Sequence, residues 1–97
     1  MAKGAVNVLG RTLAHAVGER SITVNTVAPG ITDTEPNAWI HASPEIESRT
    51  ASASAVGRIG QPADIADIVA FLASEDARWI TGHLIDATGG TFLGPRL

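Results

Sequence analysis

The sequence has no cysteine and no tyrosine, and aromatic residues make up only 4% of it. Without cysteine the chain can form neither a disulfide nor a thiolate metal site, and we expect a cytoplasmic protein. No apolar run approaches the ~20 residues that a membrane-spanning helix needs, so we expect no membrane association. The net charge of −3 leaves no basic excess, and nucleic acid is therefore not expected as a partner.

What the chain does contain is typical of a globular protein. Of its 97 residues 44% are hydrophobic and 18% are charged, and ten are glycine. This length allows one domain at most and is short for a doubly wound sheet with helices on both faces. We therefore predict a single, incomplete domain over residues 1–97.

Two segments repeat apolar residues at the spacing of a helix with one buried face. The first spans residues 3–17 and ends before Gly18, and the second begins at Pro62. No Ser, Thr, Asp or Asn precedes the first segment to cap its free N–H groups, so we expect it to be cut from a longer helix. The predicted buried stripes are Ala5, Val8, Leu9, Thr12 (through its methyl group), Leu13 and Ala16 in the first helix and Ile65, Ile68, Val69 and Leu72 in the second.

Two apolar runs, residues 21–28 and 83–87, predict parallel strands. Between them, residues 35–58 show little periodicity and are predicted to form a lid or substrate loop, with a short helix starting at Ser43-Pro44-Glu45. The order helix, strand, lid, helix, strand predicts an α/β fold. The first strand runs into Pro29-Gly30 and a polar loop, and ligands of such sheets bind beyond the carboxyl ends of the strands.

Four sequence blocks stand out by their order and spacing. They are Lys3-Gly4-Ala5, Asn25-Thr26-Val27-Ala28-Pro29-Gly30, Arg58-Ile59-Gly60-Gln61-Pro62-Ala63-Asp64-Ile65-Ala66, and Ile80-Thr81-Gly82 followed by Asp86 and Gly89-Gly90. Together they resemble the C-terminal part of the short-chain dehydrogenase/reductases, which are Rossmann-fold, NAD(P)-dependent oxidoreductases. Each block is weak alone, the four together are specific, and the resemblance covers essentially the whole chain.

The resemblance implies the C-terminal part of a Rossmann-type doubly wound parallel sheet and hydride transfer between NAD or NADP and a small-molecule alcohol or carbonyl substrate. It implies that Lys3 assists a catalytic tyrosine by lowering its pKa and binds the nicotinamide ribose. It also implies that Pro29, Gly30, Thr32 and Thr34 hold the nicotinamide end of the cofactor. Subunits of the family commonly form dimers or tetramers, so a homo-oligomer is expected.

The same resemblance shows what the chain departs from. The family's tyrosine stands four residues before its lysine, which would put it two residues before Met1, and the chain contains no tyrosine anywhere. The family's catalytic serine and glycine-rich cofactor turn have no counterpart either. We therefore expect Met1 to be an internal methionine of a longer enzyme and the 97 residues to be inactive alone, which leaves open whether this chain is an enzyme.

Two other functions stay open. The chain could be a non-enzymatic fragment that associates with itself or with a full-length relative, or a small phosphate-ligand binder built on residues 29–34. The sequence decides neither the substrate nor the choice between NAD and NADP.

Each candidate residue also has a structural interpretation. Lys3 can be an exposed residue of a frayed first turn, and Pro29-Gly30 an ordinary turn. A structural role is favoured for Asn25, through side-chain bonds to the backbone. The three histidines are too scattered to suggest a metal set. We expect Asp33 to be solvated, Trp39 to line a substrate pocket, and Trp79 to pack against the sheet or a neighbouring subunit.

Overall fold

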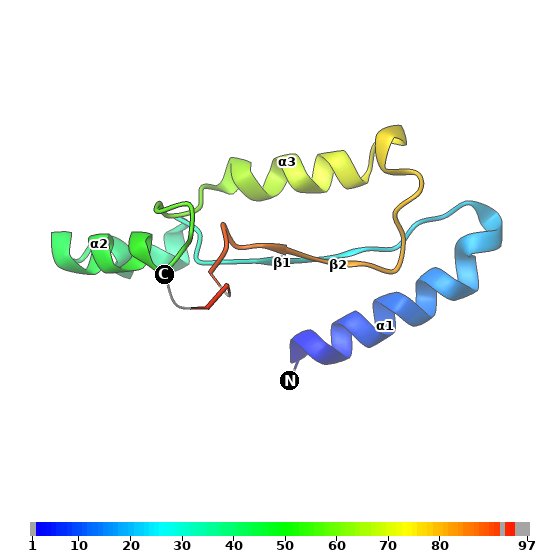
Figure 1. The fold of residues 1–97 in the computed structure, drawn as a ribbon, viewed down its shortest axis with the longest axis horizontal. Helices are drawn as coiled ribbons and strands as arrows, with labels where there is room; N and C mark the ends of the chain where they lie inside the picture. Colours follow the sequence, from blue (N-terminus) through cyan, green and yellow to red (C-terminus); the bar gives the residue numbers. More distant parts are fainter. Residues whose placement is uncertain (1, 92, 95–97) are drawn as a thin grey trace. The chain divides into compact units, whose positions relative to one another are not determined.

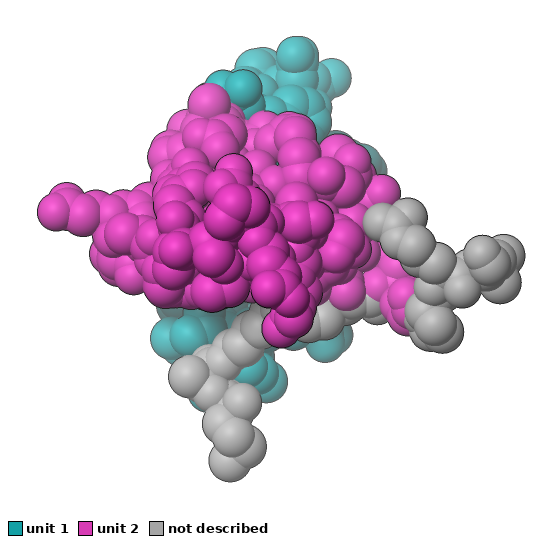
Figure 2. Space-filling model, turned by 90° about the vertical axis from the view of Figure 1, so that its left-hand side faces the viewer, with its two compact units in different colours: residues 1–28, 67–85 teal, residues 29–66, 86–97 magenta. Residues whose placement is uncertain are grey.

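The computed structural model of the chain describes residues 2–91, 93 and 94 (Figure 1). These residues form two compact units. Unit 1 comprises residues 1–28 and 67–85, and unit 2 comprises residues 29–66 and 86–97 (Figure 2). The interpretation of the chain as one partial domain stays a prediction.

A two-stranded sheet pairs β1 (Thr26–Pro29) with β2 (Leu84–Ala87). The two strands run side by side in Figure 1 and are parallel, and the α/β class predicted from the sequence is confirmed. A backbone hydrogen bond of 2.9 Å from the Thr26 N–H to the His83 carbonyl marks one end of the pairing. The first strand begins later than predicted: residues 21–25, which the predicted strand included, are not strand.

In unit 1, side chains add to the backbone pairing just before β1, where the Gly82 N–H donates to the Val24 carbonyl at 2.7 Å. The Asn25 amide donates to the Ile80 carbonyl at 3.0 Å and accepts from the His83 N–H at 3.1 Å. The Thr81 hydroxyl accepts from the Val24 N–H at 3.0 Å. The structural role predicted for Asn25 is therefore confirmed: its side chain satisfies the backbone of the segment that leads into β2.

The helix α1 (Ala2–Val17) buries a different face from the predicted one. Its buried residues are Gly10 and Ala14, whereas Val8 and Leu9 are 64% and 59% exposed. A side chain at Gly10 would place its Cβ 2.9 Å from the Thr26 hydroxyl. The small residues thus let the helix approach β1 closely, and the large apolar residues predicted as the buried stripe lie at the surface of unit 1.

The rest of unit 1 comprises η1 (Gly18–Arg20), the second half of α3 (Pro62–Leu72) and η3 (Glu75–Ala77). α3 contains no buried residue, and Val69 is half exposed. The prediction that the apolar stripe of α3 is buried in the core is therefore wrong. Trp79 is 95% exposed and does not pack against the sheet.

Unit 2 contains two short helices where the sequence predicted a lid. A 3₁₀ segment, η2 (Glu35–His41), is followed by α2 (Pro44–Ser52). As predicted, the Ser43 side chain caps α2 by accepting from the Ile46 N–H at 3.2 Å. Ile40 of η2 is completely buried and is the largest such side chain in the described part of the chain. It anchors η2 within the unit.

Candidate functional site

The loop that follows β1 begins with a glycine that no other residue can replace without a shift. A Cβ at Gly30 would lie 3.0 Å from the Cα and 3.1 Å from the Cβ of Thr88. The Gly30 N–H donates to the Ala87 carbonyl at 3.1 Å. The absent side chain thus lets the loop leave β1 against the segment that follows β2. We call residues 30–34 the strand-end loop.

Thr32 sits at the centre of the strand-end loop and is buried. It forms an isolated parallel bridge with Gly60, in which the Asp33 N–H donates to Gly60 at 2.7 Å and the Gly60 N–H donates to Ile31 at 3.3 Å. In extended backbone the N–H and C=O of one residue point to the same side, so those of Thr32 point away from Gly60.

The two outward-facing backbone groups of Thr32, its carbonyl and its N–H, differ in whether they are hydrogen-bonded. Its carbonyl accepts from the Asn37 side-chain amide at 2.9 Å and lies 3.5 Å from the Thr34 hydroxyl. No described residue accepts a hydrogen bond from its N–H. The Thr34 side chain is exposed, and its bond to Thr32 is long. One backbone donor and one hydroxyl are therefore available to a ligand at the end of β1.

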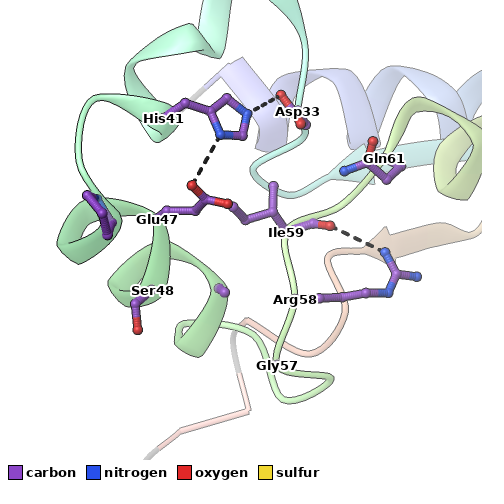
Figure 3. A pocket seen from close by; sticks show the side chains of 10 residues that line it. Asp33, His41, Glu47, Ser48, Gly57, Arg58, Ile59 and Gln61 are labelled. Atoms are coloured by element: carbon purple, nitrogen blue, oxygen red, sulfur yellow. Dashed lines mark hydrogen bonds and ion pairs between the residues drawn. The ribbon is translucent and has the colours of Figure 1, made fainter.

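His41 lies between two carboxylates (Figure 3). Its Nε2 is 2.9 Å from Asp33 Oδ1, and its Nδ1 is 3.4 Å from Glu47 Oε2. The Asp33 carboxylate, and after it Glu47, raises the pKa of His41 above its usual 6.5. In return the hydrogen bond from His41 lowers the pKa of Asp33. The ring therefore carries a positive charge further into the neutral pH range than an isolated histidine would.

A cavity of about 620 Å³ opens beside this histidine in unit 2. It is lined by Asp33, His41 and Glu47 on one side and by Arg58, Ile59 and Gln61 on another (Figure 3). It has the size of a small-molecule pocket and carries the convergent polar groups that such pockets use.

Arg58 is held in that wall by Asp64 at the start of α3. Its guanidinium donates both Nη1 and Nη2 to the two carboxylate oxygens, at 2.7 and 2.9 Å. Asp64 also accepts from the Gln61 N–H at 2.7 Å, which satisfies a free donor at the helix start. The Arg58 guanidinium holds the pKa of the Asp64 carboxyl far below its usual range.

The structure brings four of the five predicted site residues together. Pro29, Gly30, Thr32 and Thr34 follow one another at the end of β1 in unit 2. Lys3 lies in the first turn of α1 in unit 1, and its side chain lies outside the described part. The roles predicted for all five remain predictions.

Sequence reasoning missed the cluster around His41. It treated Asp33 as a solvated loop acid and His41 as one of three unrelated histidines. No local spacing marks the cluster, because its members come from the strand-end loop, η2 and α2. Among the described residues, no group of three or more His, Cys, Asp or Glu is arranged to hold a metal ion. Nor is any described helix both long and apolar enough to cross a membrane.

Comparison with known proteins places these features in a family. A family model described as enoyl-(acyl carrier protein) reductase matches residues 1–91. An uncharacterized oxidoreductase of Methylorubrum extorquens is 48% identical over 90 residues, which cover 91% of this chain and 36% of that protein.

Two solved structures give the same result. The angucycline C-6 ketoreductase LanV with bound NADP is 51% identical, with a TM-score of 0.84 over 97% of this chain and 36% of that one. The 4-hydroxyisoleucine dehydrogenase complexed with NADH is 30% identical, with a TM-score of 0.87 over 96% of this chain and 38% of that one. The chain thus spans a little over a third of these relatives, and it belongs to the short-chain dehydrogenase/reductase family.

Proposed function

We propose that the strand-end loop holds the nicotinamide end of NAD or NADP in an oxidoreductase that interconverts an alcohol and a carbonyl compound. The observation that carries the proposal is the pair of available groups at the end of β1. These are the Thr32 N–H, which no described residue accepts, and the exposed Thr34 hydroxyl. Relatives with NADP or NADH bound support the choice of cofactor.

The residues present fit a carboxamide. A nicotinamide carboxamide offers one carbonyl acceptor and one NH₂ donor, so it pairs with one donor and one acceptor on the protein. The Thr32 N–H supplies the donor. The Thr34 hydroxyl supplies the acceptor, because a hydroxyl oxygen has two lone pairs. When bound, the cofactor supplies or accepts the hydride.

The chain's own contribution is orientation. Fixing the carboxamide at two points defines which face of the ring meets the substrate, and such positioning lowers the barrier to transfer. Gly30 supports this position by letting the loop run close to Thr88. Lys3 would assist the family's tyrosine and hold the nicotinamide ribose.

We propose further that the 97 residues do not catalyse this reaction alone, because the family's acid/base tyrosine has no counterpart among them. The substrate is a small alcohol or carbonyl compound. The cavity of about 620 Å³ beside His41 has room for such a compound.

The test measures the binding of NADPH to the chain. Calorimetry gives the affinity, and the backbone amide shifts show whether the strand-end loop takes part. Replacing Thr34 by valine keeps the side-chain shape and removes the hydroxyl. Losing one net hydrogen bond of about 1 kcal/mol weakens binding about fivefold. Thr12→Val is the matched control, since the Thr12 residue is exposed on α1 and its hydroxyl donates to the Val8 carbonyl at 3.0 Å.

The proposal fails if NADPH moves no amide signal of the loop, or if Thr34→Val binds as tightly as the unmodified chain. Inorganic phosphate and AMP serve as competitors. If they bind as tightly as NADPH, the loop is a phosphate site, and the nicotinamide assignment is wrong.

One observation favours the second candidate function, association without catalysis. α1 exposes four large apolar side chains in unit 1, and exposed apolar surface of this kind marks an interaction site. They are Val6, Val8, Leu9 and Leu13, each between 44% and 64% exposed. Analytical ultracentrifugation of the chain and of the double variant Val8→Ser/Leu9→Ser tests this candidate. A dimer that the double variant abolishes supports it, and a monomer at all concentrations contradicts self-association.

A further inference from the structure

The strand-end loop is held by η2 through two side chains. The Asn37 amide donates to the Thr32 carbonyl at 2.9 Å, and His41 Nε2 lies 2.9 Å from the Asp33 carboxylate. η2 is itself fixed by Ile40, which is completely buried. The position of the loop therefore depends on contacts from a segment that the proposed function does not otherwise use.

His41 extends this hold to a third segment. Its second ring nitrogen faces Glu47, in the first turn of α2, at 3.4 Å. One side chain thus joins the strand-end loop, η2 and α2 (Figure 3). The three side chains are partly exposed, with relative exposures of 47% for His41, 31% for Asp33 and 52% for Glu47.

The chemistry of the two contacts requires a particular form of the ring. A carboxylate can only accept, so each ring nitrogen must carry a hydrogen to bond its partner. Both nitrogens are donors only in the imidazolium form. A neutral ring keeps one of the two contacts and turns a lone pair toward the other carboxylate.

The two carboxylates that face His41 both favour the imidazolium. Asp33 faces it from the strand-end loop and Glu47 from α2, and both raise its pKa. Arg58 lines the same cavity, but its guanidinium is paired with Asp64.

We propose that His41 is a positioning residue for the cofactor: by joining Asp33 to Glu47 it sets the place of the Thr32 N–H and the Thr34 hydroxyl, which flank Asp33. This inference rests on the proposed function of the strand-end loop. It adds His41 to the residues that serve the cofactor and makes cofactor affinity depend on pH. Loss of the ring proton releases one carboxylate and loosens the loop.

The sign of the pH effect follows from the direction of the shift. His41 has a pKa above its usual 6.5 in the folded chain, so its contacts are complete in mildly acidic solution. One of the two contacts is lost as the pH rises through the pKa of His41 in the folded state. Cofactor affinity therefore falls over the same range, by about two- to fivefold, the effect expected of an exposed ion pair.

The experiment is an NMR titration of the 97-residue chain between about pH 5.5 and 9, the range that brackets a histidine's proton loss. It follows the His41 ring and the amides of the strand-end loop, without and with NADPH. His41→Gln removes the titrating ring. Glu47→Gln keeps the ring and its contact with Asp33 but removes one carboxylate. His15→Gln is the matched control, since it removes an exposed histidine from α1.

We expect the Thr32 and Thr34 amides to titrate with the midpoint of the His41 ring, and NADPH affinity to change with the same midpoint. Both transitions disappear in His41→Gln and move to lower pH in Glu47→Gln, whereas His15→Gln changes neither. Loop amides that stay flat while the ring titrates overturn the inference.

The two proposals fail in different ways. If the loop amides follow His41 but NADPH perturbs none of them at any pH, the proposed function is wrong and the cofactor role of His41 falls with it. If NADPH binds with an affinity that is the same at every pH, the proposed function stands and the positioning role is overturned.

Discussion

Replacing Ile40 by alanine tests whether η2 anchors the strand-end loop. Ile40 is completely buried, so the substitution removes three carbon atoms from a filled site. At about 0.8 kcal/mol for each buried carbon, the lost transfer free energy is about 2.4 kcal/mol. The cavity left behind adds to this, and measured Ile→Ala losses run from about 2 to 5 kcal/mol. We expect the free energy of unfolding to fall by about 3 kcal/mol.

The assay is urea unfolding followed by circular dichroism and by tryptophan fluorescence. Val56→Ala is the matched control, because Val56 lies in the same unit and is 65% exposed. It should change the free energy of unfolding by less than about 0.5 kcal/mol. If Ile40→Ala does not fold, Ile40→Val, with an expected loss of about 1 kcal/mol, replaces it.

An anchoring role for Ile40 is excluded if Ile40→Ala loses no more stability than Val56→Ala. The same role predicts a local change, because η2 carries the Asn37 amide that donates to the Thr32 carbonyl. The amide shifts of the strand-end loop should therefore change in Ile40→Ala and stay unchanged in Val56→Ala.

Two further predictions concern the surroundings of the site in unit 2. Gly90 has a φ of +84°, and a Cβ there would lie 2.7 Å from the Cβ of Ala55. Gly90→Ala should therefore lower the free energy of unfolding by about 1–3 kcal/mol. Urea titration measures this loss, and an unchanged unfolding midpoint would contradict it. Arg58→Gln removes both bonds to Asp64, whose pKa lies below its usual 3.8 in the folded chain. The stabilisation by the Arg58–Asp64 pair is therefore present above about pH 4 and is lost in stronger acid. The melting temperatures of the unmodified chain and of Arg58→Gln should converge as the pH falls. A difference that stays constant with pH would contradict a stabilising role of the pair.

The family and the start of two helices could be predicted from the amino-acid sequence. Both depend on local chemistry. Ser43 supplies a cap and Pro44 a preset φ for α2, and Pro62 does the same for α3, so no distant residue is needed to define either start. The strand-end loop was predicted in the same way, from an apolar run that ends in Pro29-Gly30. The order of the four family blocks needs no tertiary information at all.

Which side chains face one another could not be predicted, because it depends on how the elements pack. α1 has large apolar residues on one side and Gly10 and Ala14 on another, and hydrophobicity alone selects the former. The close approach to β1 selects the latter, because a helix can come this near only where its side chains are small. Likewise, the contacts of His41 join segments that are separate in sequence, and no periodicity records which acids a loop histidine will meet.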